Sequence, residues 1–374
     1  MHLLRWIFKV NTFAGCSQTS SWTSPIKKFL YTVYTFVLFV LLHSFCLTQI
    51  LDIVYNVNSQ DEFSENIYWT VGVALTCFKM WSLLHNRDNY AILIDELERK
   101  PLLPANTEEI EIRTKFDKVA ERNAIAYMTV VALSIGWMIL SSFLKKFRNR
   151  KLTYRAWLPY NYSSSSIFLI TYAYQTAGIT LAMLLNIGCD TLLGGLLIHT
   201  YGQFEILRHR LNHIAKNEKD SAKQCAHLHN DIYKLVIHFF YNISLCGLSL
   251  YRLKQSEINS KMIEIILPTC SILMQILYYC WYGNEVKVKS LEVFDMVIES
   301  NWMSLDNDAK KILIMIMRRA TVPIEFNTMH LVSINLECFK TVSTKYIFSY
   351  ATPHTKTIYS IFSINFYKGN YPYS

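Results

Sequence analysis

The stretch YYCWYGNEV, residues 278–286, follows directly on the apolar segment Ile263–Leu277. With its aromatic flank, this segment is long enough to cross a membrane, since a helix needs roughly 20 mostly apolar residues to span about 30 Å of hydrocarbon. The motif therefore predicts the end of a membrane helix.

The composition agrees with a membrane protein. The 374 residues are 52% hydrophobic and 17% charged, against about 25% charged in a typical soluble domain. Too few polar side chains remain to cover a soluble protein of this size. We expect an all-α membrane protein with seven transmembrane helices, approximately Phe29–Leu51, Ile67–Leu84, Ala124–Phe143, Ile167–Leu197, Leu235–Tyr251, Met262–Tyr282 and Met329–Tyr350.

Polar or charged side chains interrupt several of these segments, including Glu264 near the start of the sixth. We expect Lys79, near an end of the second segment, to extend its ammonium toward water. The fifth segment is short and contains His238 and Asn242. The seventh must face protein or water on one side, which suggests a pore or a subunit contact, because it contains Glu337, Lys340 and Lys345.

The charged loops predict the orientation. Lys27 and Lys28 precede the first helix, whereas the next loop, residues 52–66, has acidic residues and no Lys or Arg. The positive-inside rule then places the N-terminus in the cytosol and, with seven helices, the C-terminus outside. Residues 144–166 are basic but fall outside; the sequon Asn161-Tyr162-Ser163 in this loop predicts glycosylation there.

The sequence contains no recognisable pattern of catalytic or metal-binding residues. The nine cysteines show no disulfide or zinc spacing. His209 and His213 are four residues apart, but no His-Glu-x-x-His accompanies them. We therefore expect no metal, no cofactor and no enzymatic activity. The N-terminus is no signal peptide, so the first membrane helix should direct insertion.

Several spaced motifs resemble the insect odorant receptor family. The opening stretch 278–286 resembles the end of the family's sixth helix, and Ala156–Tyr160 its aromatic–proline loop before the fourth. Similar spacing is found for Tyr172, Gln175, Asp190, Leu192, His199, Gln203, residues 311–320, Pro323, Ser333, Leu336, Phe339 and Val342. The resemblance covers about residues 25–350.

The resemblance implies a subunit of an odorant-gated, non-selective cation channel. Such a subunit assembles as a hetero-tetramer with a shared co-receptor subunit in the plasma membrane of olfactory sensory neurons. It implies a cytosolic N-terminus (1–28), helices one to six with their loops (29–282), a cytosolic anchor (283–325), a last transmembrane helix (326–350) and an atypical tail (351–374).

It also implies three sets of functional residues. Odorants, which are small, volatile and apolar, would bind in the outer half of the bundle near Trp69, Val73, Ser134, Trp137, Met138, Ser141, Thr176, Ile179, Met183, Pro268 and Ile272. The pore would be lined by Val342, Tyr346 and Ser349. The subunit anchor would contain Tyr279, Trp281, Tyr282 and Trp302.

Two departures from the family pattern leave alternatives open. The region 232–246 is about ten residues shorter, and Pro353 interrupts the expected end of the last helix. The alternatives are a gustatory receptor-like channel subunit, a G-protein-coupled receptor, or a non-conducting isoform with an altered tail. No Asp-Arg-Tyr follows the third helix, which argues against the G-protein-coupled receptor.

Overall fold

The computed structural model describes residues 9–16, 24–88, 92, 97–214, 220–233, 262–325, 327–328, 332–333, 336–337 and 339–341. Its named elements are α2 (Pro25–Tyr55), α3 (Gln60–His85), α5 (Thr107–Lys145), η1 (Phe147–Asn149), α6 (Ser165–Asn212), α8 (Met262–Glu299), η2 (Trp302–Ser304), α9 (Asn307–Ala320), β1 (Asn327–Thr328) and β2 (Val332–Ser333). Residues 220–233 form a further helix. The predicted all-α class is confirmed, apart from the antiparallel pairing of β1 with β2.

Local sequence signals set the helix starts. Pro25 occupies the first turn of α2, where its missing amide hydrogen costs nothing. The Ser59 hydroxyl accepts from the amide of Glu62 at the start of α3, and the Asn106 side chain accepts from the amide of Glu109 in α5. The Glu109 carboxylate also accepts from the amide of Ala105, the residue before the cap, at 2.7 Å, so two side chains hold the start of α5.

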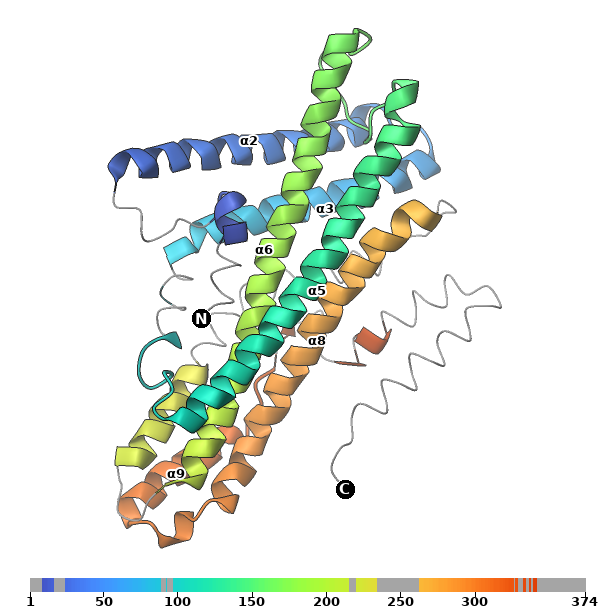
Figure 1. Cartoon of the computed structure of the whole chain (residues 1–374). Helices are drawn as coiled ribbons and strands as arrows, with labels where there is room; N and C mark the ends of the chain where they lie inside the picture. The colour runs from blue at the N-terminus through green and yellow to red at the C-terminus, as the bar shows by residue number, and fades with distance from the viewer. Residues whose placement is uncertain are drawn as a thin grey trace.

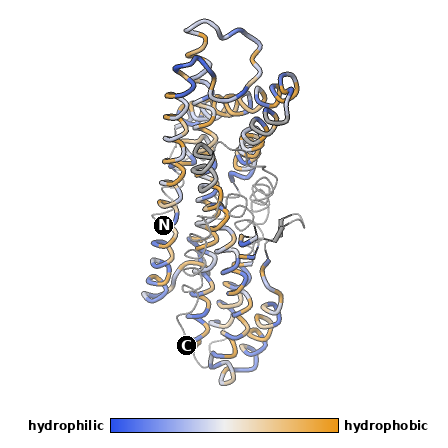
Figure 2. Tube along the Cα trace, turned by 90° about the vertical axis from the view of Figure 1, so that its right-hand side faces the viewer, coloured by the Kyte–Doolittle hydropathy of each residue, from blue (hydrophilic) through white to orange (hydrophobic). Residues whose placement is uncertain are grey.

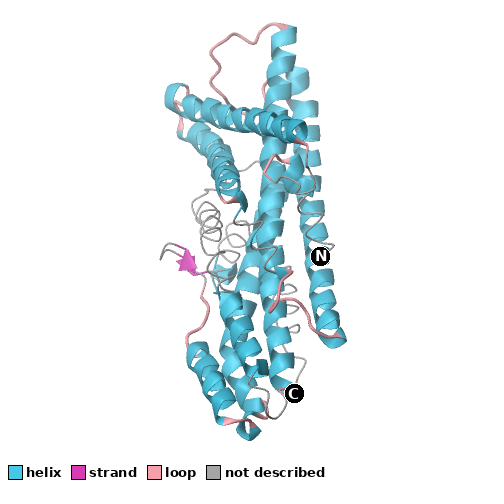
Figure 3. Ribbon diagram, turned by 90° about the vertical axis from the view of Figure 1, so that its left-hand side faces the viewer, coloured by secondary structure: helices cyan, strands magenta, loops and turns pink. Residues whose placement is uncertain are grey.

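The long helices α5, α6 and α8 run alongside one another, while α2 and α3 cross them at a steep angle (Figures 1 and 3). At 1.5 Å per residue, the 48 residues of α6 span about 72 Å, far more than about 30 Å of hydrocarbon. The 39 residues of α5 and the 38 of α8 also exceed this thickness. The bundle therefore continues outside the membrane, and Figure 2 shows many hydrophilic residues where α8 and α9 end.

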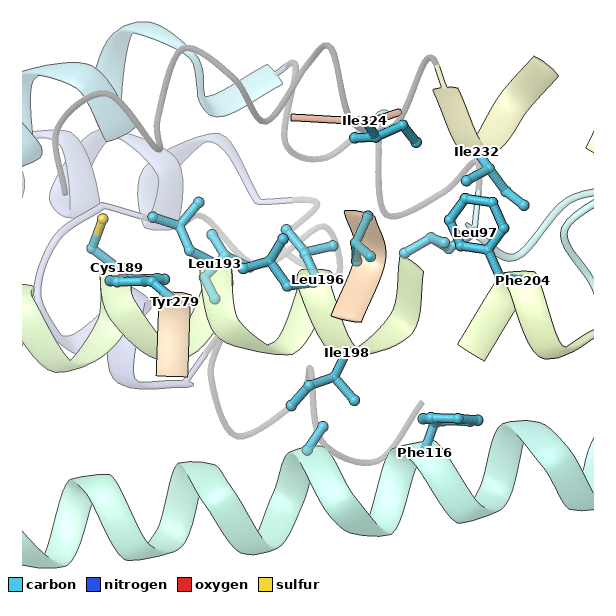
Figure 4. Close-up of a cluster of buried hydrophobic side chains, with 14 of the residues drawn as sticks. Leu97, Phe116, Cys189, Leu193, Leu196, Ile198, Phe204, Ile232, Tyr279 and Ile324 are labelled. Atoms are coloured by element: carbon cyan, nitrogen blue, oxygen red, sulfur yellow. The ribbon is translucent and has the colours of Figure 1, made fainter. Parts of the chain in front are cut away.

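The helix α6 is the centre of the bundle, because it contacts α2, α3, α5 and α8. Its residues Leu193 and Leu196 are 1% exposed and lie in a continuous core (Figure 4). Glycines allow the close approach: a Cβ added at Gly178 would meet the ring of Phe45 in α2 at 2.9 Å.

A buried network of charged and polar groups ties four helices together. The Lys79 ammonium of α3 lies 2.8 Å from a carboxylate oxygen of Asp190 in α6, and both side chains are almost fully buried. Tyr127 of α5 and Tyr279 of α8 donate to the same carboxylate at 2.8 Å and 3.0 Å. The expectation that Lys79 reaches water is therefore wrong. The nearby Asp190 supplies a buried partner, which makes burial of the ammonium possible.

The predicted membrane segments are recovered in part. Among the described residues, α2, Thr107–Asn149 and α6 are long and apolar enough to cross a membrane by length and composition. The predicted segments 67–84 and 262–282 lie within α3 and α8. The predicted fifth segment lies outside the described residues. The last segment was expected to be helical from Met329, but Val332–Ser333 pairs with Asn327–Thr328 as a strand instead.

Candidate ligand site

The loop between η1 and α6 covers one end of the bundle and is held there by side chains of α6, α2 and α3. Gln175 of α6 accepts from the Tyr154 amide at 3.1 Å and donates to the Tyr154 carbonyl at 3.0 Å. Arg155 pairs with Asp52 at 3.3 Å and with Glu62 at 3.0 Å. These contacts turn the Tyr154 ring inward, where burial raises the pKa of its phenol and keeps it neutral.

Two cavities lie beneath this loop and share a wall. The first, which we call the polar cavity, has a volume of about 120 Å³. Its lining is mostly hydrophilic and consists of Gln49, Asn66, Trp69, Met138, Ser141, Ser142, Lys145, Lys146, Leu152, Thr153, Tyr154 and Arg155. Helices α2, α3 and α5 and the covering loop all contribute to it.

The second cavity is smaller and mostly hydrophobic, and we call it the apolar cavity. Its volume is about 10 Å³. It is lined by Ile135, Met138, Ile139, Ser142, Thr153, Tyr154, Tyr172, Thr176, Ile179 and Met183. Met138 belongs to both linings, and its flexible, polarisable side chain can adapt to different shapes. A movement of this side chain would enlarge either space.

A cluster of hydroxyl groups lies in the shared wall. The Ser142 hydroxyl is 2.6 Å from that of Thr153 and 3.0 Å from that of Tyr172. Each hydroxyl can donate or accept, so the cluster can turn a proton toward an acceptor or a lone pair toward a donor. The wall can therefore orient a molecule whose body is apolar and which carries one polar group.

Gln49 of α2 stands out in the polar cavity. Its side chain is 0% exposed, and neither its amide nitrogen nor its amide oxygen has a hydrogen-bond partner within the described residues. Leaving such buried groups unpaired costs roughly 1–3 kcal/mol each. The amide is thus an unused donor and acceptor beside the polar cavity, and a small movement of the side chain would bring it to the cavity wall.

The structure brings together part of the predicted ligand set. Trp69 and Ser141 line the polar cavity, Thr176, Ile179 and Met183 line the apolar cavity, and Met138 lines both. The remaining described members line neither cavity: Val73 is buried in the core, Ser134 bonds Ser271 of α8 at 2.9 Å, Ile272 packs against the core, and Trp137 is 39% exposed. The Pro268 side chain lies outside the part of the chain whose side chains the structure describes.

Sequence reasoning missed Gln49, Ser142, Thr153 and Tyr154. The signal available for Tyr154 was Gln175, because an amide inside an apolar helix needs a bonding partner. The sequence does not show which group bonds Gln175. The structure shows that its partner is the backbone of Tyr154. Gln49 gave a similar signal within the first membrane segment.

Three of the predicted anchor residues, Tyr279, Trp281 and Tyr282, lie near the middle of α8, and Trp302 lies in η2 beyond its end. Tyr279 is 3% exposed and bonds Asp190 of its own chain, so its side chain is not on the subunit surface. Tyr282, which accepts from Asn123, is half-buried, as are Trp281 and Trp302. A different set is exposed on the following turns of α8: Val288, Leu291, Phe294 and Ile298 are 39–51% exposed.

The other predicted sites have separate positions. The pore residues Val342, Tyr346 and Ser349 lie outside the described residues. Asn161 is exposed in the covering loop, where its side-chain oxygen accepts from the Ser163 amide at 3.0 Å. Its glycosylation stays a prediction.

Comparisons with known proteins identify the family. A model of the 7tm odorant receptor family matches residues 59–346. Odorant receptor 33b of Drosophila melanogaster is 22% identical over 279 residues, 69% of this chain and 73% of that protein. Odorant receptor 67c of the same organism is 23% identical over 370 residues, 87% and 89% of the two chains.

The fold is also similar to that of a solved receptor. The insect olfactory receptor OR5 from Machilis hrabei, in complex with eugenol, superposes with a TM-score of 0.79 at 14% identity. The match covers 93% of this chain and 97% of that one. The predicted all-α, seven-helix membrane architecture agrees with this fold, and the family model covers more than half of the sequence. The chain belongs to the 7tm odorant receptor family.

Proposed function

We propose that this odorant receptor is a ligand-gated, non-selective cation channel subunit in the plasma membrane of olfactory sensory neurons. Its ligand, a small volatile molecule, binds in the polar and apolar cavities beneath the loop that contains Tyr154. The observation that carries the proposal is the pair of cavities with a common hydroxyl-bearing wall. A hydrophobic space beside a few fixed polar groups is the usual form of a site for such ligands.

The cavities favour a ligand with an apolar body and one hydroxyl or carbonyl group. With Met138 moved aside to enlarge the apolar cavity, the body would contact Ile179 and Met183, while the polar group would reach Ser142 or a shifted Gln49. The similar receptor OR5 was solved with eugenol, a phenol with an apolar side chain, which has this chemistry. Eugenol and its analogue without the phenolic hydroxyl are therefore a useful first pair of test ligands.

Gln49 is the residue that should distinguish such a pair. We expect Gln49→Leu to weaken the response to the hydroxyl-bearing ligand about tenfold and the response to its analogue much less, since about 1.4 kcal/mol of lost hydrogen bonding corresponds to a tenfold change. The matched control is Gln275→Leu, which changes a buried glutamine of α8 that lines neither of the two cavities. Equal losses for both ligands would remove Gln49 from recognition.

We also propose assembly with a co-receptor subunit through the exposed stripe Val288, Leu291, Phe294 and Ile298 of α8. Their spacing of three and four residues puts them on one helix face, beyond the predicted end of the membrane helix at Tyr282. Apolar side chains grouped on a surface outside lipid commonly mark a protein contact. We expect Ile298→Asp to reduce co-purification with the co-receptor, and Ile110→Asp, an exposed residue of α5, to leave it unchanged.

The function as a whole is tested by expression with and without a co-receptor. The proposal expects odorant-evoked cation current that requires both subunits. Odorant-evoked second-messenger signalling without a current would instead favour a G-protein-coupled receptor. The pore role of Val342, Tyr346 and Ser349 rests on the sequence, as does the prediction that residues 351–374 limit conduction; replacing that tail with a short aliphatic helix should raise the current.

A further inference from the structure

The end of α6 and the start of α5 bring three metal-ligating side chains together. His209 and His213 of α6 have ring centroids 4.3 Å apart. The Glu108 carboxylate of α5 lies 2.6 Å from Nε2 of His209. One donor atom of each residue lies within 4.8 Å of the other two. The spacing of the two histidines is visible in the sequence, but Glu108 is 101 residues from His209 and approaches it only in the folded chain.

The hydrogen bonds around the histidines leave suitable ligand atoms. Nδ1 of His213 donates to the His209 carbonyl at 2.8 Å, because a carbonyl can only accept. In the neutral ring this leaves Nε2 of His213 with a free lone pair. Nδ1 of His209 faces a Glu109 carboxylate oxygen at 3.8 Å, while its Nε2 faces Glu108. A small shift would let Glu109 accept a hydrogen bond from His209, the arrangement in which an outer carboxylate orients a metal-binding imidazole.

Hydrogen bonds from Arg210 connect the end of α6 to the start of α5 and the loop before it. Arg210 contacts both carboxylate oxygens of Glu109, at 2.9 Å and 2.8 Å. The same guanidinium donates to the carbonyls of Pro101 at 2.8 Å and Leu103 at 3.1 Å. The positive charge beside the histidines is thus already neutralised, and the backbone that carries Glu108 cannot move far from α6.

Two of the three side chains are exposed enough to move into the distances that metal coordination requires. Zinc bound by histidine and carboxylate ligands has bonds of about 2.0–2.2 Å, so tetrahedral donor atoms lie roughly 3.3–3.5 Å apart. Glu108 is 66% exposed and His213 is also exposed, so both side chains can shift by about 1 Å and an ion can reach them. His209, at 13% exposed, provides the fixed ligand.

We propose that Glu108, His209 and His213 bind a divalent transition-metal ion such as Zn²⁺, with water completing the coordination. The site joins the start of α5 to the end of α6, at the end of the bundle that the predicted orientation places in the cytosol. A bound ion would oppose separation of these two helix ends. The proposal uses no part of the ligand cavities and is independent of the channel function.

Zinc titration of the full-length chain, purified in detergent and freed of metal, tests the site directly. We expect saturable binding of about one Zn²⁺ per chain and a higher melting temperature with the ion. His213→Ala should weaken binding by about tenfold or more. His227→Ala, which alters an exposed histidine in the helix 220–233, should bind as the unmodified chain does.

Glu108→Gln provides a second variant if loss of His213 disturbs the helix end. The amide is nearly the same size but is a poor metal ligand, so binding should weaken while the metal-free melting temperature stays unchanged. Equal zinc affinity for the unmodified chain, His213→Ala and Glu108→Gln would overturn the proposal. Absence of saturable binding to the unmodified chain would do the same.

Discussion

Helices α2 and α6 are both long and strongly apolar, yet α6 lies at the centre of the bundle and α2 lies at its periphery. In the most apolar stretch of α2, 28% of residues are buried within the protein, whereas 78% are buried in α6. Hydropathy therefore indicates that both helices can enter a membrane but does not indicate which one other helices surround. The difference lies in the kind of residues that interrupt the apolar sequence.

The central helix α6 contains residues that make sense only inside a bundle. Asp190 needs the Lys79 ammonium and two tyrosine hydroxyls, and Gln175 needs the Tyr154 backbone. Gly178 gives Phe45 of α2 room to approach. On α2, by contrast, large side chains such as Phe36 and Val37 are more than half exposed, as expected of a face toward lipid.

The largest expected effect comes from removing the charge at the centre of α6. Asp190→Leu would leave Lys79 buried without its carboxylate and should lower the free energy of unfolding by about 3–5 kcal/mol. Denaturation of the receptor in detergent would measure the loss. The double variant with Lys79→Met should recover most of it, because two apolar side chains can replace a buried ion pair. Full stability of the single variant would show that the pair is not buried.

A core truncation on α6 should have the next largest effect. Leu193 is 1% exposed, so Leu193→Ala removes buried methyl groups and leaves a cavity. We expect a loss of about 2–5 kcal/mol in the free energy of unfolding. The same denaturation experiment applies. A loss below about 1 kcal/mol would mean that this face of α6 is much less tightly packed than the core of a folded protein.

The contact between the two helices should be sensitive to a single methyl group. Gly178→Ala places a Cβ 2.9 Å from the Phe45 ring, an overpacked contact that we expect to cost about 1–3 kcal/mol. Gly194→Ala on the same helix has open space around its Cβ and should be neutral or stabilising by up to about 1 kcal/mol, since alanine favours a helix. Similar melting temperatures for the two variants would argue against the close approach of α2 to α6.

The smallest effect is expected on the outer face of α2. Phe36 is 66% exposed, and Phe36→Ala should change the free energy of unfolding by less than about 0.5 kcal/mol. The reason is that lipid or detergent tails replace the lost contacts. A loss as large as that of Leu193→Ala would show that this face contacts protein, which would place another subunit against α2.

Five of the predicted membrane segments lie within α2, α3, α5, α6 and α8, because a long apolar stretch marks where a helix can cross a membrane. The sequence did not predict how far α5, α6 and α8 continue beyond that thickness, or the strand pairing at Val332–Ser333. The sequence did not predict the pairing of Lys79 with Asp190. These residues are 111 positions apart, and Lys79 alone was consistent with an ammonium that reaches water. Several residues of the ligand set implied by the family resemblance line the two cavities of the proposed ligand site, whose binding role stays a prediction. The wall of these cavities was not predicted, because Tyr154 and Thr153 enter it from a loop whose path depends on Gln175 and Arg155.

The ligand set implied by the resemblance includes α5 residues that do not line the cavities. Ser134 and Ser141 are about two turns apart, but α8 covers Ser134 whereas the cavity lies beside Ser141. Trp137 was attractive as a large aromatic side chain, yet it projects toward the outside of the chain. Which part of a helix face meets a neighbour, a cavity or lipid is decided by tertiary packing, and periodicity alone cannot show it.

The ligand site is tested most directly by comparing two adjacent residues of α5 in cells that also express a co-receptor. Met138 lines both cavities, and Trp137 lines neither. We predict that Met138→Ala shifts the half-maximal concentration of active odorants by about tenfold, or changes their order of preference, by removing roughly 1–3 kcal/mol of apolar contact. Trp137→Ala should leave the dose–response curves unchanged at equal surface expression. Altered responses for Trp137→Ala and unchanged responses for Met138→Ala would contradict the site.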